Sequence, residues 1–254
     1  MYKLLYFALP IVVSLSSCST TQHVVGSKSD FGVQLDTLRL FDETRQREIP
    51  IAIYQPINEL ENQKVVIFSH GYGANYQKNY LVYEYVTRFL ASKGYYVISV
   101  QHELPTDSLL PTSGIPKVVR LPMWERGVDN IFFVISELIK TKPTLDFHDI
   151  TLIGHSNGGD ISLLFPQYYP DIVDKIITLD HLRVTLPKKY KLGVYSLRSS
   201  DKTADEGVLL TEDERNEYGI IIEQLKNVKH NDMNDFGKRK SKKLIQQFIF
   251  EFLN

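Results

Sequence analysis

Apolar and polar positions follow two different periods along the chain, and together they outline a series of strands and helices. Residues 33–40 and 49–54 alternate apolar with polar side chains, which is typical of a half-buried antiparallel strand pair. Continuous apolar runs or short apolar-rich stretches indicate more strands, expected at residues 65–68, 95–100, 150–153, 175–179, 192–197 and 218–228. Helical spacing of apolar residues predicts helices at residues 80–92, 128–139, 158–168 and 240–252.

The alternation of these strands and helices predicts an α/β fold. We expect a mostly parallel central sheet of about eight strands with helices on both faces. Two stretches lack periodicity and are expected to be loops. Residues 101–122 are rich in proline, and residues 198–216 are acidic. Both follow strands, so they are expected at the sheet edge where ligands bind in α/β proteins.

Length and composition narrow the class of protein without assigning an activity. A chain of 254 residues with 43% hydrophobic residues suits one α/β domain with a sizeable core. The formal net charge of −1 gives no reason to expect a nucleic-acid partner. The sequence contains no dinucleotide fingerprint, phosphate-binding loop or metal-ligand spacing, so neither a cofactor nor a metal is expected.

The first residues have the pattern of an export signal. Lys3 precedes an apolar run at residues 4–15, which is too short to span a bilayer because that takes about 20 residues. The run ends in Ser16-Ser17-Cys18, which resembles a bacterial lipobox with its lipidated cysteine. We therefore expect a signal peptide at residues 1–17, a tether at 18–31 and a domain at 32–254. The expected location is the bacterial cell envelope, with Cys18 anchoring the protein to the membrane.

A candidate nucleophile lies between a predicted buried strand and a predicted helix. The segment Gly154-His155-Ser156-Asn157-Gly158 matches the pattern G-x-S-x-G in the setting that a nucleophile elbow requires. Glycines on both sides allow a sharp turn that exposes the serine hydroxyl at the edge of the sheet. We therefore predict that Ser156 is the nucleophile.

A serine nucleophile needs a base, and the base needs an acidic partner. In this arrangement the chain order is serine, acid, histidine, and His230 is the histidine that follows the last predicted strand. Asp201 and Asp180 each follow a predicted strand at the correct edge. Reach alone does not separate the two residues. We favour Asp201 as the acid and keep Asp180 as the alternative.

Hydrolysis of an acyl bond also needs donors for the oxyanion. The backbone N–H of Asn157, directly after the nucleophile, is the first expected donor. The second is expected in the loop after an early buried strand. Residues 65–68 lead directly into His70-Gly71-Tyr72, so we predict the N–H of Tyr72 as the second donor.

These motifs together resemble the α/β-hydrolase superfamily from about residue 33 to the end of the chain. The layout is similar to its uncapped branch, with dienelactone hydrolases, cutinase-like enzymes and platelet-activating-factor acetylhydrolases. An acid at Asp180 resembles the arrangement in the acetylhydrolases, and an acid at Asp201 resembles the arrangement in the cutinase-like enzymes. Dienelactone hydrolases use a cysteine as the nucleophile, whereas this chain has Ser156. We therefore do not expect this protein to share their substrate. The short connection between Asp180 and Leu192 leaves no room for a large cap.

Three functions are compatible with this pattern. The first is a serine esterase that acts on small-molecule or lipid esters through an acyl-enzyme. The second is an amidase or thioesterase with the same residues, and the third is a lipoprotein that binds ligands without turnover. The nucleophile, base and acid favour the esterase. The acyl and alcohol groups, the membrane leaflet and the oligomeric state do not follow from the sequence.

Overall fold

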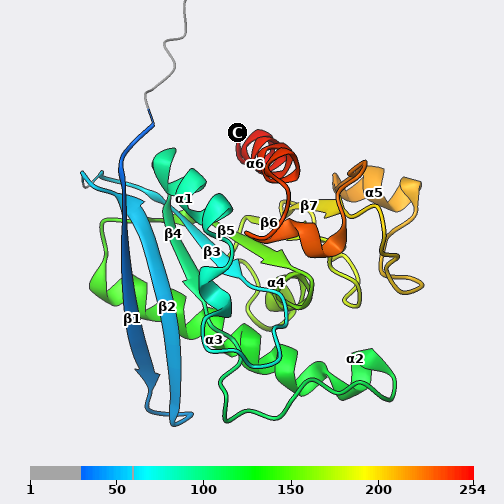
Figure 1. Cartoon of the computed structure of the whole chain (residues 1–254), viewed down its shortest axis with the longest axis horizontal. Coiled ribbons are helices and arrows are strands. Elements are labelled where there is room, and N and C mark those ends of the chain that lie inside the picture. Colours follow the sequence, from blue (N-terminus) through cyan, green and yellow to red (C-terminus); the bar gives the residue numbers. More distant parts are fainter. Residues whose placement is uncertain (1–29, 59) are drawn as a thin grey trace, which may run out of the picture.

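The computed structural model describes residues 30–58 and 60–254, and the predicted signal peptide, Cys18 and most of the tether lie outside these residues. Its centre is an eight-stranded sheet in the order β1-β2-β4-β3-β5-β6-β7-β8 (Figure 1). The strands are β1 (Val33–Asp42), β2 (Arg47–Pro56), β3 (Lys64–Ser69), β4 (Tyr96–Val100), β5 (Asp146–His155), β6 (Lys175–Leu179), β7 (Gly193–Arg198) and β8 (Ile221–Gln224). β1 and β2 pair antiparallel, β2 is antiparallel to β4, and the other neighbours are parallel.

Helices cover both faces of the sheet and form two separate cores. The helices are α1 (Glu84–Ser92), α2 (Pro116–Val119), α3 (Leu121–Thr141), α4 (Asn157–Tyr168), α5 (Glu212–Tyr218) and α6 (Arg239–Leu253), with 3-10 turns η1 (Asn79–Leu81) and η2 (His230–Met233). α3 and α4 pack on one face, and α1 and α6 on the other (Figure 1). Within β3, Val65 and Ile67 face the first core and Val66 and Phe68 the second. This explains the unbroken apolar run, because both faces are buried.

The predicted fold class is confirmed, and the main differences lie between the strands and in the last strand, because β8 covers only part of the expected residues 218–228. α3 begins at Leu121, well before the expected residue 128, because Pro122 stands in the first turn, where a missing N–H costs nothing. α5 occupies part of the expected acidic loop and of the expected strand at 218–228. Its start is fixed by a capping box between Thr211 and Glu214. The short helix α2 also lies in an expected loop, with Pro116 in its first turn.

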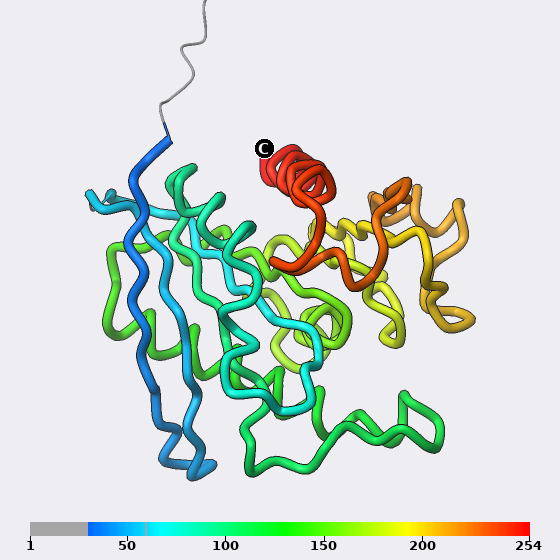
Figure 2. The backbone as a smooth tube through the Cα atoms, in the orientation of Figure 1, coloured from blue at the N-terminus to red at the C-terminus, as the bar shows by residue number. Residues whose placement is uncertain are grey.

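The parallel strands bring several chain segments to one edge of the sheet. The last residues of β3, β5, β6 and β7 lie at this edge, where Ser69 pairs with Gly154, His155 with Leu179, and Leu179 with Leu197. The connection from β6 to β7 contains no helix, so no large cap covers this edge. The segment from β4 to α3 extends outward beside it (Figure 2). Among the described residues, no helix combines the length and apolarity that crossing a membrane requires.

Candidate active site

Ser156 occupies a sharp turn between β5 and the first turn of α4. Its φ of 51° and ψ of −117° lie in a region that residues other than glycine rarely adopt. A Cβ on Gly154 would collide with the carbonyl group of Gly158, and one on Gly158 with the carbonyl of Ser69. The turn is also held by the Ser156 N–H, which donates to the Leu179 carbonyl at 2.9 Å. The structure thus has the elbow geometry that the sequence pattern predicts.

Three side chains form a hydrogen-bonded line at this edge of the sheet. Ser156 Oγ lies 3.0 Å from His230 Nε2, and His230 Nδ1 lies 2.6 Å from Asp180 Oδ2. With a neutral imidazole, the serine hydroxyl donates to Nε2 and the Nδ1–H donates to the carboxylate. The serine is partly exposed and the other two side chains are buried, so a ligand can reach the hydroxyl while Asp180 stays shielded from water.

Asp180 is held as an anion by its surroundings. Its second oxygen, Oδ1, accepts from the Ser199 N–H at 2.9 Å and faces the Arg198 guanidinium at 3.0 Å. Burial alone would raise the pKa of Asp180, but the hydrogen bond from His230, the charge of Arg198 and the contacts with Ser199 outweigh it and lower this pKa. A buried carboxylate of this kind can orient an imidazole and stabilise its charged form.

Asp201, which the sequence analysis favoured as the acid, does not contact the imidazole. Its Oδ1 accepts from the backbone N–H of His230 at 2.7 Å. Asp201 is exposed on the loop beyond β7, whereas Asp180 directly follows β6 with a positive φ of 55° that aims it at His230. The geometry therefore corrects the preference for Asp201 and brings the alternative, Asp180, to the base.

The two expected oxyanion donors are both free in the described part of the chain. Neither the backbone N–H of Asn157 nor that of Tyr72 donates a hydrogen bond there. The neighbouring N–H of Gly71, in contrast, donates to the Tyr83 hydroxyl at 3.0 Å. Tyr72 itself accepts the Leu110 N–H with its hydroxyl at 2.9 Å. This contact fixes the loop after β3 against the segment that follows β4.

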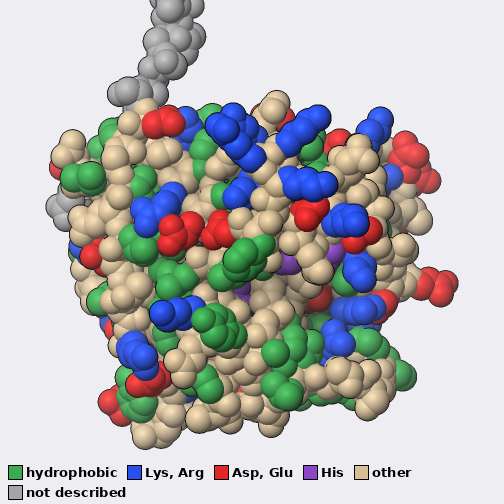
Figure 3. Space-filling model, viewed as in Figure 1, with side chains coloured by type: hydrophobic (Ala, Val, Ile, Leu, Met, Phe, Trp, Pro, Cys, Tyr) green, Lys and Arg blue, Asp and Glu red, His purple; other side chains and the backbone are tan. Residues whose placement is uncertain are grey.

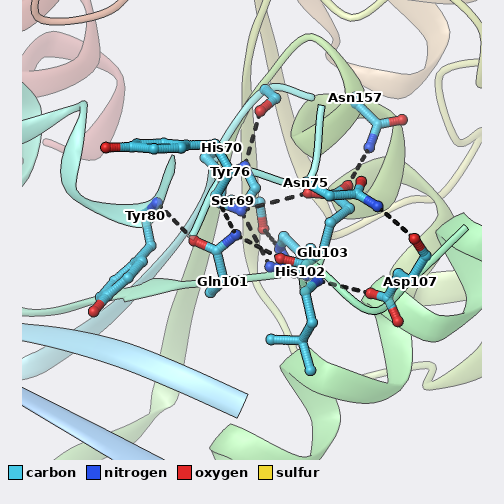
Figure 4. A network of polar contacts seen from close by, with 12 residues as sticks. Ser69, His70, Asn75, Tyr76, Tyr80, Gln101, His102, Glu103, Asp107 and Asn157 are labelled. Atoms are coloured by element: carbon cyan, nitrogen blue, oxygen red, sulfur yellow. Dashed lines mark hydrogen bonds and ion pairs between the residues drawn. The ribbon is translucent and has the colours of Figure 1, made fainter. Parts of the chain in front are cut away.

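A buried polar network lies behind the elbow and was not predicted from the sequence (Figure 4). Trp124 is 1% exposed, and its Nε1–H donates to Asn157 Oδ1 at 2.7 Å. Asn157 Nδ2 in turn donates to Glu103 Oε1 at 3.1 Å. No local sequence motif indicates these contacts, because the three residues come from α3, α4 and the segment after β4. Figure 3 shows histidine side chains in a hollow at the centre of one face.

Comparisons with known proteins support the fold of this chain. No protein-family model and no curated protein matches the chain. A dienelactone hydrolase-like promiscuous phosphotriesterase from metagenomic libraries is 12% identical with a TM-score of 0.62, over 87% of this chain and 97% of that chain. Esterase Est22 is 13% identical (TM-score 0.61, 88% and 80% covered), and Est1E from Butyrivibrio proteoclasticus 12% identical (TM-score 0.58, 85% and 98% covered). The chain therefore has the α/β-hydrolase fold.

Proposed function

We propose that the protein is a serine hydrolase that cleaves carboxylic esters through an acyl-enzyme. The observation that carries this proposal is the line of hydrogen bonds from Ser156 through His230 to Asp180, at 3.0 and 2.6 Å. Ester cleavage by this route requires a nucleophile, a base and an oriented imidazole. The names of the structural neighbours, which include esterases, agree with this class of reaction.

In the first step, Ser156 Oγ attacks the ester carbonyl carbon while its proton moves to His230 Nε2. The carbonyl oxygen becomes an oxyanion, which the backbone amides of Tyr72 and Asn157 would stabilise. The intermediate collapses by breaking the bond to the alcohol oxygen, which takes the proton from His230. Asp180 stabilises the imidazolium during this transfer.

In the second step, water attacks the acyl-enzyme and gives one proton to His230 Nε2. The second tetrahedral intermediate releases the carboxylic acid as Ser156 Oγ takes that proton back. Every proton and bond is thus accounted for without a cofactor. The same steps apply to amides and thioesters, and the preference for esters rests on the names of the structural neighbours rather than on a specific contact.

The direct test is labelling with a fluorophosphonate probe, which reacts with activated serines. We expect wild-type protein to be labelled and the Ser156→Ala variant to remain unlabelled, with circular dichroism showing that both are folded. A panel of esters, thioesters and anilides then separates the substrate classes. A folded wild type that is neither labelled nor active on this panel would favour a ligand-binding protein without turnover.

We also propose that the protein is anchored to a bacterial membrane through lipidated Cys18. The support is the sequence pattern before Cys18, which is the only cysteine in the chain. Growth with an alkyne analogue of palmitate should label the wild type and leave the Cys18→Ser variant unlabelled. If the two were labelled equally, lipidation would have to occur elsewhere or the anchor would not exist.

A further inference from the structure

Glu103 is a buried carboxyl group between the two segments that carry the expected oxyanion donors. Its side chain lies just after β4 and the residue is only 2% exposed. Oε1 accepts from Asn157 Nδ2 at 3.1 Å, and Oε2 lies 3.7 Å from His70 Nε2 (Figure 4). Asn157 begins α4, and His70 begins the loop that contains Tyr72. One carboxyl group thus faces both halves of the proposed oxyanion site.

The orientation of the Asn157 side chain is determined by its other partner. The indole Nε1–H of Trp124 can only donate, and it lies 2.7 Å from Asn157 Oδ1. The Asn157 amide nitrogen must therefore point toward Glu103. Because Trp124 and Asn157 are both buried, this arrangement fixes the first residue of α4 directly beside the nucleophile.

The contacts of His70 indicate that Glu103 carries a proton. The backbone N–H of His102 donates to His70 Nε2 at 3.1 Å, so this nitrogen has no hydrogen of its own. The proton of the imidazole is on Nδ1, which lies 2.8 Å from the Gly71 carbonyl oxygen. Glu103 Oε2 therefore faces an acceptor, and it has no hydrogen-bond partner among the described residues. A neutral carboxylic acid removes the repulsion between these two acceptors.

The electrostatic surroundings agree with this protonation state. Burial raises the pKa of Glu103 to about 7 and lowers that of His70 to about 4. Burial also keeps the nearby His102 neutral, because its pKa lies well below the ordinary value. The charged groups that act on Glu103 come from β2, the segment after β4 and α3, and they are Arg47, Asp107 and Arg126. Asp107 pairs with both arginines, at 2.7 and 3.3 Å, so their charges are partly compensated.

We propose that Glu103 is a positioning residue that, in its neutral form, holds Asn157 and the His70 loop for oxyanion binding, and that its ionisation lowers the rate of hydrolysis. This inference rests on the proposed function of Ser156. An ionised Glu103 places a negative charge behind the site where the oxyanion forms. Like charges repel, and with an effective dielectric constant of about 20 this repulsion is expected to slow the reaction on the order of tenfold.

Trp124 allows this titration to be followed without any substrate. It is the only tryptophan in the chain, and it is joined to Glu103 through Asn157. We expect the tryptophan fluorescence of the full-length protein to change in one step centred near pH 7, and we expect the Glu103→Gln variant to lack this step. Glu125→Gln is the matched control, because Glu125 is the neighbour of Trp124 in α3 but pairs with Tyr168 near the surface. Wild-type fluorescence without a step between about pH 5 and 9 would overturn the proposal.

Kinetics then tests whether the titration affects catalysis. We expect kcat of the wild type to fall on the order of tenfold above pH 7, and kcat of Glu103→Gln to stay high, with KM little changed in both. An identical alkaline fall in both proteins would overturn the role of Glu103. A wild type that is neither labelled by fluorophosphonate nor active at any pH would overturn the proposed function instead, while the fluorescence step would still report the state of Glu103.

Discussion

The hydroxyl of Tyr83 lies 2.8 Å from His155 Nδ1, and this contact joins three loops of the candidate site. The Gly71 N–H donates to the same hydroxyl at 3.0 Å, and His155 Nε2 lies 3.1 Å from the backbone carbonyl oxygen of His230. Burial lowers the pKa of His155 to about 3, so the ring is neutral and each nitrogen has one role. The chain of bonds therefore runs from the loop of Tyr72, through the elbow, to the proposed base.

Removal of this hydroxyl should affect both activity and stability. We expect Tyr83→Phe to lower kcat by about threefold to tenfold and the free energy of unfolding by about 1–3 kcal/mol, because it leaves buried polar groups on Gly71 and His155 unpaired. The control is Tyr169→Phe, which removes a part-buried hydroxyl that donates to Asp129 Oδ1 at 2.9 Å and contacts no residue of the site. Urea unfolding and ester kinetics would measure both. Equal losses of kcat in the two variants would mean that the chain of bonds has no special role.

The two aspartates near His230 should differ sharply in their effect on catalysis. Asp180→Asn removes the charge that faces Nδ1, and we expect kcat to fall by about 10⁴-fold, as for a triad that loses its acid. Asp201→Asn can still accept from the His230 N–H, so we expect a loss of less than about tenfold. Steady-state kinetics with an activated ester is the measurement. A larger loss of kcat in Asp201→Asn than in Asp180→Asn would indicate that Asp201 is the acid.

Asp160 should make the protein less stable as the pH rises. Burial raises its pKa to about 6, although the backbone N–H groups of Val184 and Arg183 donate to it. Its pKa in the unfolded chain is the ordinary 3.8. The folded state therefore binds more protons between these values, and stability falls as the pH rises from about 4 to about 6.

Asp160→Asn removes the charge and retains the acceptor oxygen. We expect this variant to be more stable than the wild type by about 1–3 kcal/mol at pH 8, and to have no such advantage at pH 4. Urea unfolding at both pH values measures the difference. If hydrogen bonds fully compensated the cost of burying the charge of Asp160, the variant would be no more stable than the wild type at either pH.

Some features of this fold depend only on residues that are adjacent in the chain. The strand in β3 and the elbow at Ser156 were predictable because each is encoded by adjacent residues. The choice between Asp180 and Asp201 was not, because both follow neighbouring parallel strands and only the backbone conformation of Asp180 aims it at the base. α5 was missed although its capping box is visible in the sequence, since the acidic composition was interpreted as a loop.

The buried networks were beyond sequence analysis for a different reason. Glu103 contacts Asn157, and Tyr83 contacts His155, across more than fifty positions of the chain. Such contacts depend on the crossing of strands and helices, not on spacing along one element. A buried glutamate is also unusual in a globular core, so composition alone would place it on the surface.

The segment between β4 and α3 should determine the preference for the acyl group. Its apolar side chains Leu109, Ile115 and Val118 are 65%, 68% and 65% exposed. The segment is tied to the site, because the Leu110 N–H donates to the Tyr72 hydroxyl. Exposed apolar side chains on a segment that contacts the loop of Tyr72 can gain free energy by covering an apolar acyl chain.

Replacement of these three residues by serine should therefore weaken the reaction with long esters only. We expect kcat/KM for a ten-carbon acyl ester to fall on the order of tenfold, with that for an acetate ester unchanged, because a short acyl group does not reach the segment. The matched control is Leu38→Ser with Phe41→Ser, which removes exposed apolar side chains on the edge strand β1. A fall of equal size for both esters would assign the segment a general structural role, and no change for either would place the acyl group elsewhere.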